Sequence, residues 1–136
     1  MKTKVGIVVS KFNEEITSLM EKNAVKVAKK LGAEITKTIY VPGAFEIPFA
    51  AKKLFENHEI EVVVVLGAVI RGQTDHDAVI VNTIAPKLLE LSLKSNKPLG
   101  FGVIGPKANT NQAQERAKEY SERAVKAALE MIKIAN

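Results

Sequence analysis

Short apolar runs and longer segments of helical periodicity alternate along this chain of 136 residues. Runs rich in Val, Ile and Leu predict strands at residues 4–10, 34–41, 62–66 and 99–104. Apolar residues that recur every three or four positions predict helices at residues 14–31, 45–57, 76–94 and 112–134. Because a helix follows each strand, the pattern predicts four parallel strands joined by right-handed helical crossovers.

The predicted helices carry three local signals. Asn13 is suited to cap the N-terminus of the first helix, and Gly32 to end it. Pro86 is expected to kink the helix at residues 76–94 or to interrupt its hydrogen bonds. That helix has an unusually broad apolar arc, formed by Ile80, Val81, Ile84, Ala85, Leu88, Leu89 and Leu91. The arc predicts packing against another subunit, and the alternative is a helix deeply buried in its own domain.

Composition narrows the class of protein. The chain shows no repeat, linker or low-complexity tract, which predicts a single domain over residues 1–136. It has no Cys, so disulfides and thiolate metal sites are excluded. We find neither a signal-peptide pattern at the N-terminus nor an apolar run near the ~20 residues of a membrane span. We therefore expect a cytoplasmic protein that does not bind membranes.

The formal net charge of +5 raises the question of nucleic-acid binding. Lys and Arg are interleaved with Glu, as in residues 52–56 and 115–119, a pattern typical of solvated helix faces. With two Tyr and no Trp, there is little aromatic surface for base stacking. We predict no nucleic-acid partner and interpret the positive charge as favourable to anionic metabolites.

Residues 66–76, which read LGAVIRGQTDH, point to chemistry. They lead from a buried strand through a Gly-polar-Thr turn to a histidine at the start of a helix. Unpaired N–H groups and the positive end of the helix dipole then face the same place, which favours an anion. His76 stands beside that place and can transfer a proton near neutral pH. The segment predicts a reaction of a phosphorylated small molecule.

Ligands of parallel sheets bind at the carboxyl ends of the strands. The loops expected there include residues 10–13, 41–46, 68–74 and 101–105. Phe12 and Phe45 each adjoin a polar residue, an arrangement that suits a flat heterocycle stacked on the aromatic ring. The alternative is that Phe12, Phe45 and Phe101 are core residues near strand ends.

Four segments in order carry a resemblance to a known family: FNEEIT (12–17), VPGAFEIP (41–48), LGAVIRGQTDH (66–76), and FG (101–102) with QAQERA (112–117). With them the chain resembles the lumazine synthase family over nearly its whole length. The resemblance implies an α/β, three-layer α/β/α sandwich of flavodoxin-like type with a four-stranded parallel sheet. It implies a transferase of riboflavin biosynthesis that condenses 5-amino-6-(D-ribitylamino)uracil with 3,4-dihydroxy-2-butanone 4-phosphate. The product is 6,7-dimethyl-8-ribityllumazine, and neither a cofactor nor a metal is expected.

The resemblance also implies a homo-oligomer, at least a pentamer, with active sites shared between adjacent subunits. Free pentamers, paired pentamers and a sixty-subunit icosahedral shell are all open alternatives. The last helix carries no inserted residues, and this favours the shell.

The same resemblance assigns the site residue by residue. The pyrimidine would be bound by Phe12, Asn13, Ala44, Phe45, Glu46, Ala68, Val69 and Ile70, with Phe101 contributed by the neighbouring subunit. The phosphate would be held by Gln73, Thr74 and Arg116, since a guanidinium fork meets phosphate oxygens in pairs. His76 matches the residue that transfers protons, so it is the predicted catalytic group.

The chain departs from the family pattern in two places. Asp77 follows His76 where most members carry an aromatic residue, and the loop at residues 105–111 is about one residue longer than usual. Arg123 is the nearest candidate for a second basic residue at the phosphate.

The alternative functions are the paralogous riboflavin synthase, which lacks the combined segments, and a flavin-binding electron carrier. Such a carrier would need a Ser/Thr/Gly-rich loop after the first strand, where this chain has residues 10–13, SKFN.

Overall fold

The computed structural model describes residues 2–72 and 76–135. The strands are β1 (Thr3–Ser10), β2 (Ala33–Val41), β3 (Val62–Ile70) and β4 (Leu99–Ala108). The helices are α1 (Glu14–Lys30), α2 (Ile47–Glu56), α3 (Asp77–Ser95) and α4 (Thr110–Ala135), with a short 3-10 helix, η1 (Ala44–Glu46), before α2. The predicted order of strands and helices is confirmed.

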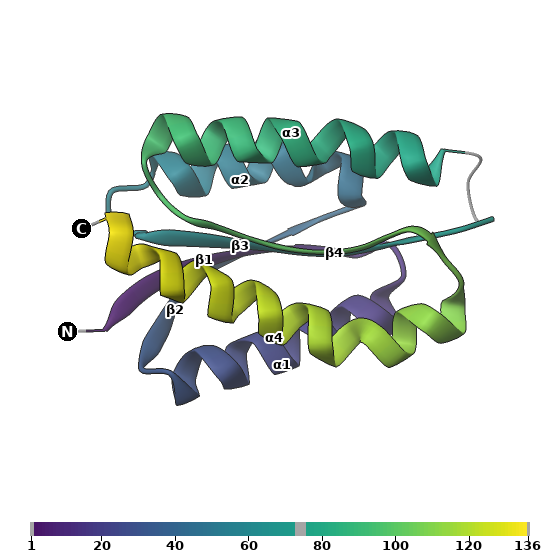
Figure 1. Ribbon diagram of the computed structural model, residues 1–136, viewed down its shortest axis with the longest axis horizontal. Helices are drawn as coiled ribbons and strands as arrows, with labels where there is room; N and C mark the ends of the chain where they lie inside the picture. Colours follow the sequence, from purple (N-terminus) through teal and green to yellow (C-terminus); the bar gives the residue numbers. More distant parts are fainter. Residues whose placement is uncertain (1, 73–75, 136) are drawn as a thin grey trace.

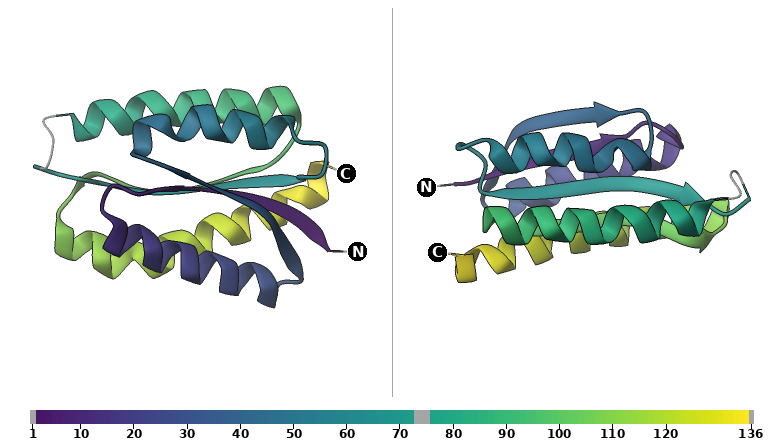
Figure 2. Two further views of the ribbon diagram at one scale, coloured as in Figure 1. Left: turned by 180° about the vertical axis from the view of Figure 1, so that it is seen from behind. Right: turned by 90° about the horizontal axis from the view of Figure 1, so that it is seen from above.

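All four strands are parallel and lie in the order β2-β1-β3-β4. Helices α2 and α3 cover one face of the sheet, and α1 and α4 cover the other (Figures 1 and 2). This is the predicted three-layer α/β/α sandwich. The chain moves outward from β1 to β2 and then crosses back to β3, so the strand order reverses between β1 and β3. In open parallel sheets the crevice at such a reversal, beyond the carboxyl ends of the strands, is where ligands bind.

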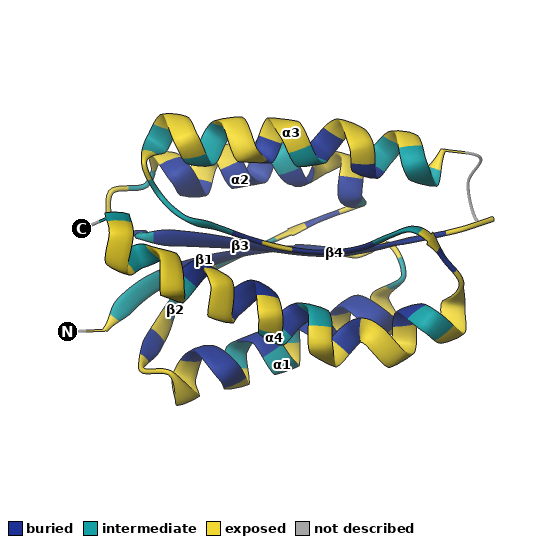
Figure 3. Cartoon of the chain, viewed as in Figure 1, coloured by how far each residue is buried: buried dark blue, intermediate teal, exposed yellow. Residues whose placement is uncertain are grey.

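Strand β3 forms the centre of the core and is buried at every position (Figure 3). Its side chains alternate between the two layers: Val62, Val64 and Leu66 pack with α1 and α4, and Val63 and Val65 with α2 and α3. A strand covered by helices on both faces needs apolar residues at consecutive positions. The valine run in the sequence has this cause.

Two strands are longer than predicted, and the predicted carboxyl ends are wrong. β3 continues to Ile70 rather than ending at residue 66, and β4 continues to Ala108 rather than 104. The two extensions pair with each other, including Ala68 with Ile104 and Ile70 with Ala108. Gly67, which the sequence places at the start of a turn, lies inside β3, and a Cβ there would lie only 3.0 Å from Ser10 Oγ.

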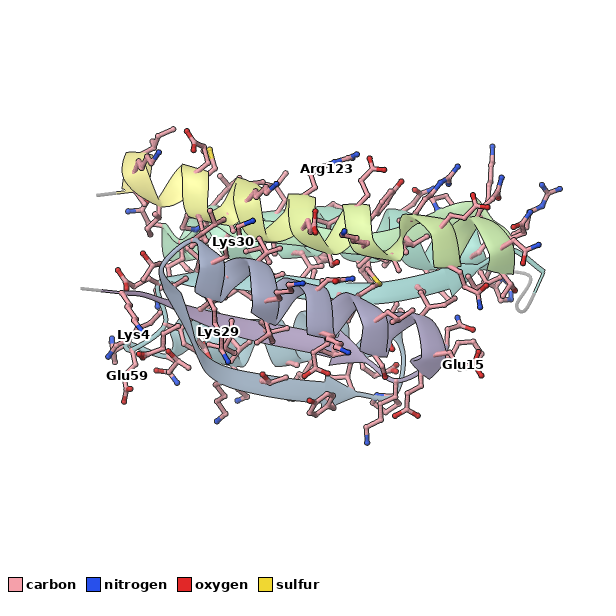
Figure 4. All side chains as sticks on the ribbon, turned by 90° about the horizontal axis from the view of Figure 1, so that it is seen from below. Lys4, Glu15, Lys29, Lys30, Glu59 and Arg123 are labelled. Carbon is pink, nitrogen blue, oxygen red and sulfur yellow. The ribbon has the colours of Figure 1, made fainter. Side chains whose placement is uncertain are left out.

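Asn13 occupies the N-cap position of α1, as predicted, but its side chain makes no capping hydrogen bond. The backbone there is left-handed (φ 65°), which aims the side-chain amide at β3 instead. Gly32, with φ 81°, follows the end of α1 as predicted. Glu15 stands in the first turn of α1, and Lys29 and Lys30 in the last (Figure 4), which complements the helix dipole.

Helix α3 runs through Pro86 without a break. The proline removes its own N–H from the helical ladder, and the helix continues to Ser95. The outer side of α3 is exposed: Leu89 is 54% and Leu93 73% accessible in the single chain. Deep burial within one domain, the alternative for this helix, is therefore wrong.

Candidate active site

The loop after β1 is tied to the end of β2, the loop that follows it, and the last part of β3. The N–H groups of Lys11 and Phe12 donate to the carbonyl oxygens of Val41 and Pro42, at 2.8 and 2.9 Å. Asn13 Nδ2 donates to the carbonyl oxygen of Ala68 at 2.8 Å. These hydrogen bonds fix the loop after β1 against both neighbouring strand ends.

A pocket of about 220 Å³, which we call the Phe12 pocket, opens at this junction. It is lined by most of the residues predicted to bind the pyrimidine, namely Phe12, Ala44, Phe45, Glu46, Ala68, Val69 and Ile70. Gly43 and Ile80 complete the lining. Sequence reasoning did not assign these two to the site, although Ile80 was placed on the apolar arc of its helix. Asn13 joins the group through its hydrogen bond to Ala68.

The aromatic rings at this pocket are not core residues. Phe12 is 52% exposed and Phe45 is 63% exposed. Two apolar rings left open to solvent beside a pocket offer flat surfaces for a heterocycle. The alternative that they serve the core is wrong, and Phe101, 36% exposed, does not serve it either.

Strand β3 presents part of its backbone edge to the pocket. Its pairing with β1 ends at Leu66, opposite Val9, whereas β3 itself continues to Ile70. Beyond Leu66, the edge of β3 that faces away from β4 therefore no longer pairs with β1. A planar ligand rimmed by amide groups can pair with such an edge as a neighbouring strand would.

Glu46 places its carboxylate over the start of η1. Its N–H donates to the carbonyl oxygen of Gly43 at 3.2 Å, and a Cβ at Gly43 would lie 3.3 Å from Glu46 Oε1. A side chain at residue 43 would displace this carboxylate by a few tenths of an ångström at the mouth of the pocket.

Phe101 lies elsewhere. It lies on β4, opposite Val65 of β3, and lines a separate groove of about 610 Å³. The groove is formed largely by exposed apolar side chains of α3 and α4: Leu89, Leu93, Met131 and Ile134. A single chain does not bring Phe101 to the Phe12 pocket.

The predicted phosphate residues are placed only in part. Gln73 and Thr74 lie outside the described residues. Arg116 is exposed on the first half of α4. His76 is exposed at the residue before α3, and its carbonyl oxygen accepts the N–H of Ile80 at 2.8 Å.

Asp77 places a carboxylate in the first turn of α3. Its Oδ2 accepts the backbone N–H of Lys107 at 2.9 Å. This hydrogen bond holds the pKa of Asp77 below its ordinary value, and the charge of Arg71 acts in the same direction. Asp77 therefore carries its negative charge at neutral pH.

Arg123 is engaged on the outer side of α4. Its guanidinium pairs with Glu119 and lies 5.4 Å from the ring centroid of Tyr120. Figure 4 shows Arg123 at the edge of α4 that lies away from α1. This geometry gives no support to Arg123 as a second basic group at the phosphate.

Residues 2–72 and 76–135 offer neither a metal site nor a membrane-spanning helix. They contain no group of three acidic or His side chains placed to bind a metal ion. Within the same residues, none of the helices combines the length and apolar character that crossing a bilayer requires.

Comparison with known proteins identifies the family. The family model described as 6,7-dimethyl-8-ribityllumazine synthase matches residues 2–136. The chain belongs to this family. A 6,7-dimethyl-8-ribityllumazine synthase of Metallosphaera sedula is 52% identical over 94% of this chain and 85% of the relative. Proteins of the same name from Pyrobaculum arsenaticum and Staphylothermus marinus are 46% and 47% identical, over 94% and 95% of this chain and 85% and 86% of theirs. The lumazine synthase segments recognised in the sequence include the loops that meet at the Phe12 pocket.

Proposed function

We propose that this chain condenses 5-amino-6-(D-ribitylamino)uracil with 3,4-dihydroxy-2-butanone 4-phosphate to form 6,7-dimethyl-8-ribityllumazine. Membership of the family supports the reaction, and the Phe12 pocket supports its location. That pocket is the single observation on which the assignment of the site rests. Riboflavin synthase and an electron carrier are not favoured.

The pyrimidine half of the site follows from the pocket. Phe12 would stack on the ring, and the edge of β3 at residues 68–70 would pair with the polar groups of the pyrimidine. The carbonyl oxygen of Ala68 accepts the hydrogen bond from Asn13, and this contact helps to order the loop that carries Phe12. The carboxylate of Glu46 would accept hydrogen bonds from hydroxyl groups of the ribityl chain.

The butanone half would lie toward the start of α3. Imine formation, loss of phosphate and ring closure each move a proton, and the imidazole of His76 would serve as both acid and base. Arg116, Gln73 and Thr74 would hold the phosphate. Holding two substrates together supplies a large part of the rate in such condensations, so loss of His76 should slow the reaction without abolishing it.

We propose further that the site is completed by a second copy of the chain. The pocket of about 220 Å³ is smaller than the roughly 300–1,000 Å³ of most ligand sites. The chain also exposes the apolar groove that contains Phe101. Placing the groove of one subunit over the pocket of the next would enclose the ligand and bury Leu89 and Leu93. Because the groove and the pocket are different surfaces, this contact can repeat from subunit to subunit around a closed ring, which accords with a pentamer.

Sixty-subunit shells, the cytoplasmic location and a single domain over residues 1–136 stay predictions.

One experiment tests the reaction and a second tests the shared site. The purified protein is mixed with both substrates, and formation of the lumazine chromophore is followed by absorbance. Absence of product from folded, assembled protein would refute the reaction. Light scattering at micromolar concentration should give at least a pentamer, and a monomer that is fully active would refute the shared site.

A further inference from the structure

The start of α3 and the end of β4 are joined by one side chain. Asp77, the first residue of α3, accepts the N–H of Lys107 at 2.9 Å across thirty positions of sequence. The backbone of Lys107 is left-handed, with φ 72°, a conformation that non-glycine residues rarely adopt. Surrounding contacts must therefore hold it there, and Asp77 supplies one of them.

A second hydrogen bond lies beside the first. The N–H of Arg71 donates to the carbonyl oxygen of Ala108 at 2.7 Å. Arg71 follows β3 and Asp77 begins α3, and they bind consecutive residues of β4, Ala108 and Lys107. The connection between β3 and α3 is thus anchored to the end of β4 at both of its ends, through Ala108 at Arg71 and through Lys107 at Asp77. His76 lies between these anchors in sequence and adjoins one of them directly.

We propose that Asp77 is a positioning residue that fixes His76 relative to the end of β4. This inference rests on the role proposed above for His76. Asp77 does not touch the substrate in this account; it sets where the first turn of α3 begins, and the carbonyl of His76 belongs to that turn.

A carboxylate is well suited to this role. Hydrogen bonds to an ionised acceptor are stronger than those to a neutral one. A negative charge in the first turn of a helix is also favoured by the helix dipole. The lowered pKa of Asp77 keeps the group in the form that binds Lys107 best. An amide in its place would keep an acceptor but lose the charge, and Ala would lose both.

The test compares Asp77→Ala and Asp77→Asn with a matched pair at the opposite end of the sheet. Glu61 Oε1 also accepts a backbone N–H, from Lys4 at 3.0 Å, far from the proposed site. Glu61→Ala and Glu61→Gln therefore remove the same kind of hydrogen bond without disturbing His76. For each variant, kcat and both KM values are measured, together with amide exchange of residues 76–80 and 107–110 by mass spectrometry.

We expect Asp77→Ala to lower kcat by about tenfold to a hundredfold, the effect of a small misplacement of a reacting group. KM for the pyrimidine should change less than kcat, because only Ile80 of its pocket lies in the turn that Asp77 anchors, and the other lining residues lie on β3, η1 and the loops after β1 and β2. Asp77→Asn should recover part of kcat, and the Glu61 variants should match the wild type. Amide exchange near His76 should rise most in Asp77→Ala, less in Asp77→Asn, and not in the Glu61 variants.

Three outcomes would overturn the proposal. Wild-type kcat in Asp77→Ala is one, and unchanged amide exchange near His76 is another. The third is an equal loss in both Asp77 and Glu61 variants that follows thermal stability, which would make the role merely structural. An inactive wild-type enzyme would refute the proposed reaction instead, and the amide exchange would still decide whether Asp77 anchors this turn.

Discussion

The side-chain amide of Asn13 reaches 2.8 Å to the carbonyl oxygen of Ala68 and joins the start of α1 to the end of β3. This hydrogen bond crosses the point where the strand order reverses, so it spans the crevice in which the ligand is expected. Phe12 precedes Asn13 in the same loop and lines the pocket. The position of the stacking ring therefore depends on a polar contact that the apolar core does not provide.

Replacing Asn13 by Ala should lower stability and raise KM for the pyrimidine. The variant loses a hydrogen bond worth about 1 kcal/mol and places Ala in a left-handed conformation that costs roughly 1–2 kcal/mol. Asn96 is also left-handed, with φ 55°, and ends α3 far from the pocket. Urea unfolding should show a loss in both Asn13→Ala and Asn96→Ala. Only Asn13→Ala should raise the pyrimidine KM, and an equal rise in both would contradict the role of the Ala68 contact.

Phe12→Ala should weaken pyrimidine binding with little effect on folding. The ring is more exposed than buried, so its removal leaves no cavity in the core. Stacking of an aromatic ring on a base is worth about 1–3 kcal/mol, which corresponds to roughly fivefold to 150-fold in affinity. Leu31→Ala is the control, since Leu31 is similarly exposed but ends α1 at the opposite end of the molecule. Calorimetry with the pyrimidine substrate should separate the two variants, and matching affinities would exclude stacking on Phe12.

Arg116→Ala should reduce the affinity for the butanone phosphate far more than the affinity for the pyrimidine. A charge-assisted hydrogen bond contributes about 1.5–3 kcal/mol, so we expect KM for this substrate to rise by roughly tenfold or more. Arg123→Ala is the matched control on the same helix, because Arg123 pairs with Glu119 on the outer side. Steady-state kinetics with each substrate varied in turn provides the measurement. Equal losses for both substrates in Arg116→Ala would refute a phosphate contact.

Leu93→Lys should weaken assembly and activity together. Leu93 lines the exposed groove with Phe101, and a charge placed there would be buried by the proposed neighbour. Leu19→Lys is the control, since Leu19 is an exposed residue of α1 on the other layer. Light scattering should show smaller particles for Leu93→Lys and unchanged particles for Leu19→Lys. An intact oligomer with Lys at residue 93 would exclude this groove from the subunit contact.

The sequence identified the loops of the site because parallel strands deliver their carboxyl ends to one edge, whatever their exact length. It misplaced the ends of β3 and β4 because Gly67 and Gly105 resemble turn residues. Gly67 lies inside β3, where the close approach of Ser10 Oγ leaves little room for a side chain. The contact between Asp77 and Lys107 could not be predicted, since it joins residues thirty positions apart through a left-handed backbone. The position of Phe101 relative to the pocket likewise depends on how two chains meet, which local patterns do not encode.

Asp77 should also give the protein a component of stability that depends on pH. Its pKa is lowered from an ordinary value of 3.8 by the N–H of Lys107, and Arg71 adds to the shift. A group with a lowered folded-state pKa stabilises the fold above its unfolded pKa, and this contribution disappears as the pH falls through the folded value. The stability difference between the wild type and Asp77→Asn should therefore be constant from pH 7 to about pH 5 and shrink below about pH 4. Thermal unfolding of both proteins across this range measures it. A difference that stays constant down to pH 3 would show that the hydrogen bond does not depend on the charge of Asp77.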